Sequence, residues 1–340
     1  MRHGLIPVLT GVAIVLGSSR ASAQDRVRAA ELTPKAEAAI EKGLKYLAKV
    51  QNADGSWDQM NQPAITALSL MAFMVKGHFP DQEPYGETMA KGVDYLLKQV
   101  KRNNGYMGKS MYEHGLATLA LSEVWGESSR SEEIREGLKK AVAVIVKAQS
   151  PAGGWRYQPD GHSHDMSVTV MQIVALASAK EAGILVPDKT IERAVSYVKY
   201  CQNDGGSFGY TGPGDGPGNS GFGRGGAGVT SLQMCGHRKS KEVARGLEYL
   251  RSLGDDPFEK DSGYPWFYYG HYYAALAMYQ ASEKDHQAWY PKIRDALVRL
   301  QSADGSWEGG IPSQAQNGYC TPMAIVILGV PYRFLPIYQR

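Results

Sequence analysis

The side chains best suited to acid–base chemistry lie in three short segments of the sequence. His164 directly precedes Asp165, Glu113 lies about 50 residues earlier, and His271 lies in a later aromatic segment. Carboxyl and imidazole groups can exchange protons near neutral pH, so these four residues are the candidate catalytic residues. Asp165, His271 and Cys320 are weak candidates for zinc ligands, but zinc requires three or four converging ligands. We therefore expect no metal and no other cofactor.

Aromatic side chains gather around the same segments. Aromatic faces stabilise positive charge and bind flat apolar molecules. Tyrosines can equally fill a core and leave their hydroxyls at its rim, and the sequence leaves both interpretations open. The candidate ligand-binding residues are Tyr112, His114, Trp266, Tyr268, Tyr272 and Tyr319.

A phrase with the pattern Gln-x-x-Asp-Gly-Ser-Trp recurs along the chain. It is nearly identical at 51–57 and 301–307, with variants at 149–155 and 202–208. With two weaker copies, the aromatic positions are 57, 106, 155, 208, 264 and 307, so the steps are 49, 49, 53, 56 and 43 residues. Six units of this length predict one repeat domain over residues 35–340.

Each unit predicts one outer helix and one inner helix. Before the phrase, apolar residues recur at helical spacing among polar ones, as at Ile40, Leu44 and Leu47. This pattern indicates an amphipathic helix with one face in solvent. After the phrase come apolar stretches such as 64–75 and 321–328, which are typical of buried helices. The pairs predict an all-α fold, and the regularity of the first and last copies favours a closed (α/α)6 ring over an open solenoid.

The repeated phrase resembles the QW motif of the terpenoid cyclase and protein prenyltransferase superfamily, whose fold is an (α/α)6 toroid. The resemblance spans about residues 35–335 and points to squalene-cyclase-like and prenyltransferase-like proteins with a single barrel. It implies a cavity where the inner helices begin, suited to an apolar isoprenoid-type ligand. The candidate residues lie at these helix starts.

The catalytic motifs of that superfamily are incomplete in this sequence. Asp165 and Thr169 align with the DxDDT motif of squalene–hopene-type cyclases, but Ser167 and the following Val replace two Asp residues, including the proton donor. Protonation of an alkene requires a strong acid, which Ser cannot supply. Asp165 is either an acid assisted by His164 or the N-cap of the next helix. The Asp-x-Cys zinc motif of the prenyltransferases is also incomplete, because Ser167 stands in place of the Cys.

Residues 205–228 form a Gly-rich insertion with 12 glycines in the fourth unit. They show neither the three-residue period of collagen nor a phosphate-binding loop. The insertion is either a mobile lid that carries Arg224 as an anion contact or a plain flexible excursion.

The first 23 residues have the pattern of a secretory signal peptide. Arg2 and His3 precede the apolar stretch 5–17, and small residues end at Ala23, where we expect cleavage. A linker at 24–34 would then lead into the toroid. We expect an exported protein, periplasmic or extracellular, with no transmembrane segment after cleavage. The three cysteines, at 201, 235 and 320, can form one disulfide or remain free thiols.

Charge and composition exclude some partners and leave three functions open. With 37 Lys and Arg against 34 Asp and Glu, the net charge of +3 is small and no basic stripe is present, so we expect no nucleic-acid partner. The first function is an enzyme or binding protein for an apolar isoprenoid-type small molecule. The second is a non-catalytic scaffold toroid. The third is a polysaccharide-acting enzyme, in which Glu113 and Asp165 would form the carboxylate pair. The oligomeric state stays undefined.

Overall fold

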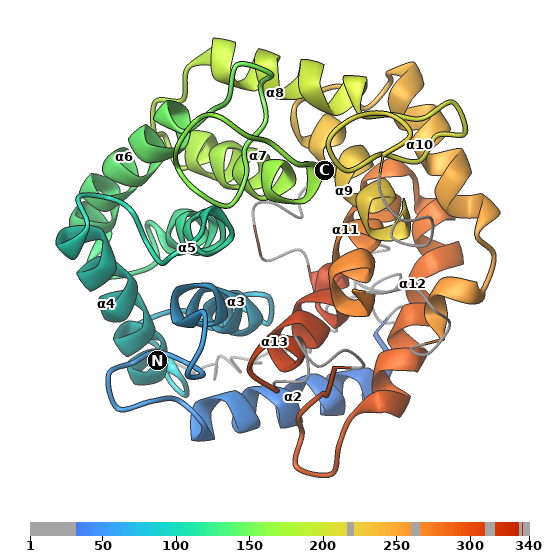
Figure 1. Ribbon diagram of the computed structural model, residues 1–340. Coiled ribbons are helices and arrows are strands. Elements are labelled where there is room, and N and C mark those ends of the chain that lie inside the picture. The colour runs from blue at the N-terminus through green and yellow to red at the C-terminus, as the bar shows by residue number, and fades with distance from the viewer. Residues whose placement is uncertain (1–31, 216–220, 260–265, 310–316, 333–334, 336–340) are drawn as a thin grey trace, which may run out of the picture.

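The computed structural model describes residues 32–215, 221–259, 266–309, 317–332 and 335. The expected signal peptide and most of the expected linker lie outside these residues. Within them the chain forms α-helices, two short 3₁₀ helices, η2 (Asp256–Phe258) and η4 (Val330–Tyr332), and no strand. Figure 1 shows the helices in two concentric rings, which confirms the all-α (α/α)6 toroid.

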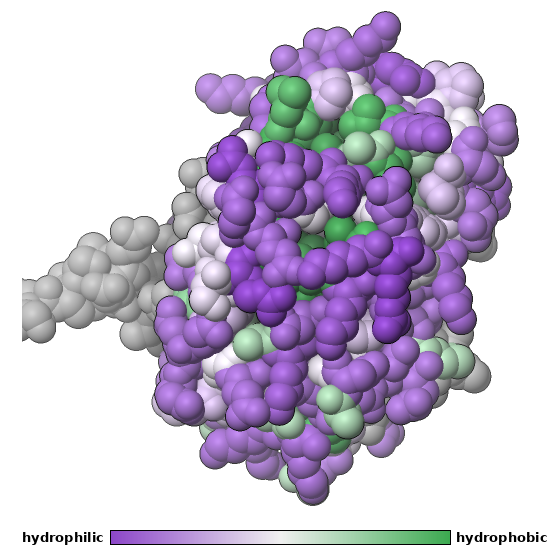
Figure 2. Space-filling view, turned by 90° about the vertical axis from the view of Figure 1, so that its left-hand side faces the viewer, coloured by the Kyte–Doolittle hydropathy of each residue, from purple (hydrophilic) through white to green (hydrophobic). Residues whose placement is uncertain are grey.

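The outer ring consists of amphipathic helices that follow one another around the molecule. In α2 the apolar residues Ile40, Leu44 and Leu47 are fully buried, while the polar residues between them face solvent. Figure 2 shows one side of this ring, where hydrophilic side chains predominate. The outer helices are α2 (Pro34–Lys49), α4 (Gly86–Arg102), α6 (Ser131–Lys147), α8 (Asp188–Tyr200), α10 (Lys241–Ser252) and α12 (Glu283–Leu300).

The inner ring consists of apolar helices that are buried on nearly every side. Each inner helix contacts the next, and the last contacts the first, so the ring is closed. No helix in the described part of the chain combines the length and hydropathy that crossing a bilayer requires. The inner helices are α3 (Gln62–Met74), α5 (Met111–Val124), α7 (Met166–Glu181), α9 (Gly221–Met234), α11 (Phe267–Ala281) and α13 (Asn317–Leu328).

In the four repeat units whose phrase begins with Gln, this side chain joins the unit to the following one in a contact that we call the clasp. The Gln149 side-chain amide donates hydrogen bonds to the backbone carbonyls of Thr190 in α8, at 2.9 Å, and of Gly153 in its own loop, at 2.8 Å. The amide thus satisfies carbonyls on two units at once, which fixes the spacing of the outer helices. The equivalent donors are Gln51, Gln202 and Gln301.

The Trp of the phrase joins the two helices of its own unit. Trp155 is fully buried, and its indole N–H donates to the carbonyl of Ile145 in α6 at 2.7 Å. Its backbone N–H donates to the Thr169 hydroxyl in α7 at 2.9 Å. Trp57 and Trp307 make the same two bonds. The phrase is therefore a structural element that positions the start of the inner helix.

The ring closes at a seam between the last unit and the first. The amide of Gln301 donates to the carbonyl of Ala39 in α2 at 2.8 Å, which repeats the clasp across the seam. Beyond α13, the Tyr332 hydroxyl accepts a hydrogen bond from Lys76 at 2.6 Å and donates one to Glu37 at 3.3 Å. The seam thus joins the end of α12 and the segment that follows α13 to α2 and to the residues just after α3.

The Gly-rich segment is only partly a loop, because α9 already begins at Gly221. Glycine weakens a helix, so its abundance here requires a packing reason. A Cβ on Gly226 would lie 2.7 Å from the backbone nitrogen of Ala274, and one on Gly223 would lie 3.1 Å from the Tyr269 ring. The glycines therefore allow α11 to approach α9 closely.

Candidate functional site

A cavity of about 630 Å³ lies inside the inner ring, at the end where the inner helices begin. Its walls come from the first turns of the inner helices and from the loops that precede them. Apolar side chains and tyrosines form most of its surface. The lining residues are Met60, Asn61, Ala64, Ile65, Leu68, Ser110, Tyr112, Glu113, Leu116, Tyr157, Ser167, Met171, Tyr210, Gly223, Arg224, Trp266, Tyr269, Tyr272, Tyr273, Tyr319 and Met323.

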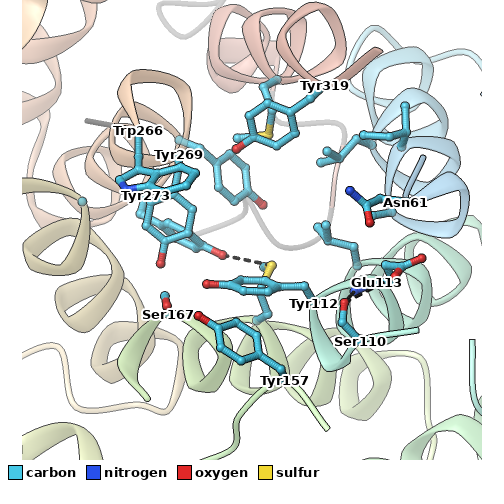
Figure 3. A pocket seen from close by; sticks show the side chains of 18 of the residues that line it. Asn61, Ser110, Tyr112, Glu113, Tyr157, Ser167, Trp266, Tyr269, Tyr273 and Tyr319 are labelled. Atoms are coloured by element: carbon cyan, nitrogen blue, oxygen red, sulfur yellow. Dashed lines mark hydrogen bonds between the residues drawn. The ribbon is translucent and has the colours of Figure 1, made fainter. Parts of the chain in front are cut away.

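Tyrosines from several helices point into this cavity, as Figure 3 shows. Tyr269 and Tyr272 flank Tyr273 on α11, with ring centroids 5.0 and 4.8 Å from the Tyr273 ring. The Tyr273 hydroxyl reaches across to the Met171 sulfur in α7 at 3.4 Å, and a thioether is a weak acceptor. Burial raises the pKa of the Tyr112, Tyr269 and Tyr273 hydroxyls, so these three phenols are neutral hydrogen-bond donors.

Two further tyrosines reach the cavity from loops. The hydroxyls of Tyr157 and Tyr210 hydrogen-bond to each other at 2.7 Å. Their backbone carbonyls accept from the first N–H groups of the helices in the preceding units, Met111 of α5 at 2.8 Å and Met166 of α7 at 2.7 Å. These N–H groups have no partner within their own helices. Each loop is thereby held over the helix start beside it.

Among the predicted site residues, Tyr112, Glu113, Trp266, Tyr272 and Tyr319 line the cavity. Glu113 is a buried carboxyl that accepts hydrogen bonds from the Lys109 backbone at 3.1 Å and the Ser110 hydroxyl at 3.4 Å. Ser110 is the N-cap of α5 and accepts from the Glu113 N–H, a variant of the capping box. Burial raises the pKa of the Glu113 carboxyl, which makes it a weaker acid.

Asp165 is the N-cap of α7 and is not among the residues that line the cavity. One carboxylate oxygen accepts from the Val168 N–H at 2.9 Å and from the Ser167 hydroxyl at 2.8 Å. The other lies 3.8 Å from Nε of Arg156. Burial raises the pKa of Asp165, and the hydrogen bonds oppose that shift. Ser167, which replaces an acid of the squalene–hopene-type motif, is the residue that reaches the cavity.

The structure does not bring the three predicted histidines to the cavity. His114 points outward, where its Nε2 donates to the Ala141 carbonyl of α6 at 3.1 Å. His271 donates to the Pro257 carbonyl at 2.7 Å. Burial lowers the pKa of both imidazoles to about 4, so both are neutral at pH 7. His164 lies in the preceding loop, with its ring against that of Tyr197.

Tyr268 and Cys320 are also directed away from the cavity. The Tyr268 hydroxyl donates to the Glu308 carbonyl at 2.9 Å, and Cys320 is buried. No disulfide joins Cys201, Cys235 and Cys320. Within the described residues, no three His, Cys, Asp or Glu side chains converge as metal ligands would.

Arg224, which the sequence offered as an anion contact, also lines the cavity. The sequence reasoning missed four tyrosines that line it: Tyr157, Tyr210, Tyr269 and Tyr273. A signal for two of them was present, because Tyr157 and Tyr210 each lie two residues after the aromatic of their phrase. Tyr269 and Tyr273 lie in the aromatic segment that was singled out, but they point in a different direction from Tyr268. To predict them, one must know which side of α11 faces the cavity.

No family model matches this chain. A curated protein with a similar segment is lanosterol synthase erg7A of Aspergillus fumigatus, 24% identical over 128 residues. That match covers 35% of this chain and only 17% of the synthase, so the chain corresponds to a small part of that relative.

Solved structures resemble the chain over most of its length. Type II terpene cyclase MstE from Scytonema has a TM-score of 0.61 at 14% identity, covering 89% of this chain and all of that one. The GH76A alpha-1,6-mannanase of Salegentibacter sp. HEL1_6 has a TM-score of 0.64 at 10% identity, covering 87% and 98%. At these identities the likeness shows the fold alone, and the chain has the (α/α)6 toroid fold that both of these proteins share.

Proposed function

We propose that this toroid binds an apolar isoprenoid-type small molecule in its central cavity. The observation that carries the proposal is the cavity itself, whose volume of about 630 Å³ lies within the range of small-molecule sites. The same fold holds geranylgeranyl dihydroxybenzoate as substrate and merosterolic acid A as product in variants of MstE. Both observations support a polyprenyl chain or a compound made from one.

The walls of the cavity suit such a ligand chemically. Ala64, Ile65 and Leu68 of α3 offer an apolar surface, while the opposite side offers tyrosine rings. Burying hydrocarbon against these walls releases roughly 25 cal/mol for each Å² removed from water. The ring faces would also stabilise a positive charge that develops on an alkene.

Glu113 is the carboxyl that lines the cavity within the described residues. Its raised pKa keeps it protonated closer to neutral pH, so it can donate a hydrogen bond to an oxygen of the ligand. The same shift makes it a poorer acid for protonating an alkene, and Asp165 is occupied as a helix cap. We therefore propose ligand binding as the primary activity, with Glu113 as the proton donor of any reaction on an oxygen atom.

The two other candidate functions receive less support from the geometry. A pure scaffold does not need an aromatic-lined cavity of this size. A glycosidase needs two carboxyl groups that face one substrate. Although the mannanase shares the toroid, Glu113 faces the cavity here and Asp165 does not, so the predicted pair does not converge on it.

The proposal is tested by native mass spectrometry after incubation with squalene or a polyprenyl lipid. We expect one bound molecule per chain, and loss of binding in Ala64→Phe, which fills the cavity from α3. The matched control is Ala143→Phe, the same change on the exposed face of α6. Absence of bound lipid in the unaltered protein, or equal binding by both variants, would overturn the proposal.

We also propose that the protein is exported, on the pattern of residues 1–23. Expression of the full chain followed by N-terminal sequencing tests this. Mature protein outside the cytoplasm beginning near residue 24 supports export. Retention of the first 23 residues contradicts it.

A further inference from the structure

The wall of the cavity formed by α9 and α11 differs in charge from the wall opposite to it. Inner helices contact in the order α3, α5, α7, α9, α11, α13, so α3 and α9 face each other across the ring. The α3 wall presents Ala64, Ile65 and Leu68, whereas the α9 wall presents Arg224. The cavity is therefore amphipathic, with hydrocarbon on one side and a cation on the other.

Arg224 is unusually buried for a charged residue, since only 8% of it is exposed. Its Nε donates to the Phe208 carbonyl at 2.9 Å, which anchors the guanidinium group beside the cavity. Burial lowers the pKa of Arg224 although Asp215 acts in the opposite direction. A cation in a low-dielectric wall attracts an anion more strongly than a cation in water does.

Tyr269 lies next to this cation and brings a hydroxyl group that can donate a hydrogen bond. Its ring packs on Gly223, the residue before Arg224. Its hydroxyl oxygen is buried and has no hydrogen-bond partner within the described residues. Leaving a buried polar group unpaired costs free energy, so such a group in a cavity wall indicates that a ligand supplies the partner.

We propose that the ligand of this cavity carries an anionic headgroup, a carboxylate or a phosphate ester, which Arg224 and the Tyr269 hydroxyl hold against the α9–α11 wall. The hydrocarbon part of the ligand then lies against α3. This inference rests on the proposed function and adds the chemical class of the polar end. A guanidinium and a phenol both donate hydrogen bonds, and bonds that involve a charged acceptor are the stronger ones.

The test compares ligands that share one hydrocarbon chain and differ only at the headgroup: geranylgeranoic acid, geranylgeranyl monophosphate and geranylgeraniol. Dissociation constants are measured at pH 7.5 by isothermal titration calorimetry on the purified protein. We expect at least one of the anions to bind about tenfold or more tighter than the alcohol. The tighter of the two anions identifies the headgroup.

Two variants and one control separate the headgroup contacts from general effects on the fold. Arg224→Gln is expected to bring the anion and the alcohol within about twofold of each other. Tyr269→Phe removes only the unpaired hydroxyl and is expected to weaken anion binding about three- to tenfold. Tyr106→Phe removes another buried hydroxyl that has no hydrogen-bond partner in the described part of the chain. Tyr106 does not line the cavity, so this change is expected to leave binding unaltered.

The possible results distinguish this inference from the one on which it rests. Equal binding of alcohol and anions by the unaltered protein would overturn the anionic headgroup and leave the isoprenoid cavity standing. Equal effects of Tyr269→Phe and Tyr106→Phe would overturn it as well, even if Arg224→Gln fails to fold. Binding of none of the three ligands would instead overturn the proposed function.

Discussion

Gly305 lies in the loop whose Gln301 forms the clasp across the seam, and it allows a sharp test of how the ring is closed. Gly305 has φ +97°, and a Cβ built there would lie 2.6 Å from the carbonyl oxygen of Lys42 in α2. An L-residue at this φ costs about 1–3 kcal/mol, and forcing extra atoms into a packed site costs a further ~1–3 kcal/mol. Gly305→Ala is therefore expected to lower the free energy of unfolding by about 2–6 kcal/mol.

Gly126 provides a control that separates the two contributions. It has φ +90°, close to that of Gly305, but nothing lies within 4 Å of a Cβ placed on it. Gly126→Ala is therefore expected to cost only the backbone strain, about 1–3 kcal/mol. Urea unfolding followed by circular dichroism gives both values. If the two variants lose the same stability, the contact between the loop and α2 does not contribute and the reasoning is refuted.

Three further predictions concern the clasp, the cap of α7 and the buried histidines. Gln301→Leu should lower the free energy of unfolding by about 2–3 kcal/mol, because the carbonyls of Ala39 and Gly305 lose their donor. Asp165→Ala should cost about 1–2 kcal/mol and Asp165→Asn less than about 0.5 kcal/mol, because Asn is an equally good N-cap. His271 has its pKa lowered to about 4 in the folded state, so the unfolded state binds more protons between pH 6.5 and 4. Its contribution to stability should fall by up to about 3 kcal/mol as the pH drops through that window, and His271→Gln should remove that part of the slope.

Each of these predictions has a result that would contradict it. A loss below about 0.5 kcal/mol in Gln301→Leu would show that the clasp is not a stabilising contact. Equal losses in the two Asp165 variants would show that capping is not the role of this residue. An unchanged slope in His271→Gln, from urea unfolding at several pH values, would show that the imidazole is not buried in neutral form.

The repeat pattern predicts the fold well because the phrase itself makes the contacts between helices. Its Gln, Gly and Trp make their contacts in the clasp or within the unit, so the recurrence of the phrase in the sequence directly indicates the repeated architecture. The alternation of amphipathic and apolar segments then predicts which helices face solvent. These features are local in sequence, and the closed ring follows from repeating them.

The site was predicted less completely. The sequence shows where each inner helix begins, but it does not show which side chains of the first turns point into the cavity. Successive residues of a helix differ by about 100° in direction, so neighbours diverge. Glu113 lines the cavity while His114 faces α6, and Tyr269 and Tyr273 line it while His271 faces η2. The residues that line the cavity recur at spacings of three and four, as expected for one face of a helix. Which face of each helix turns toward the cavity depends on packing against the neighbouring helices.

The seam has a consequence for how the chain folds. In an open solenoid each repeat can form next to a finished neighbour, and stability grows by roughly equal increments. Here the bond between Gln301 and Ala39 joins residues 262 positions apart, and closing so long a loop costs about 5 kcal/mol in chain entropy. An incomplete ring does not offset this entropy cost, because the units at its two ends lack the contacts of a neighbouring unit. We therefore expect all-or-none unfolding, with mutations at the seam accelerating unfolding far more than they slow folding.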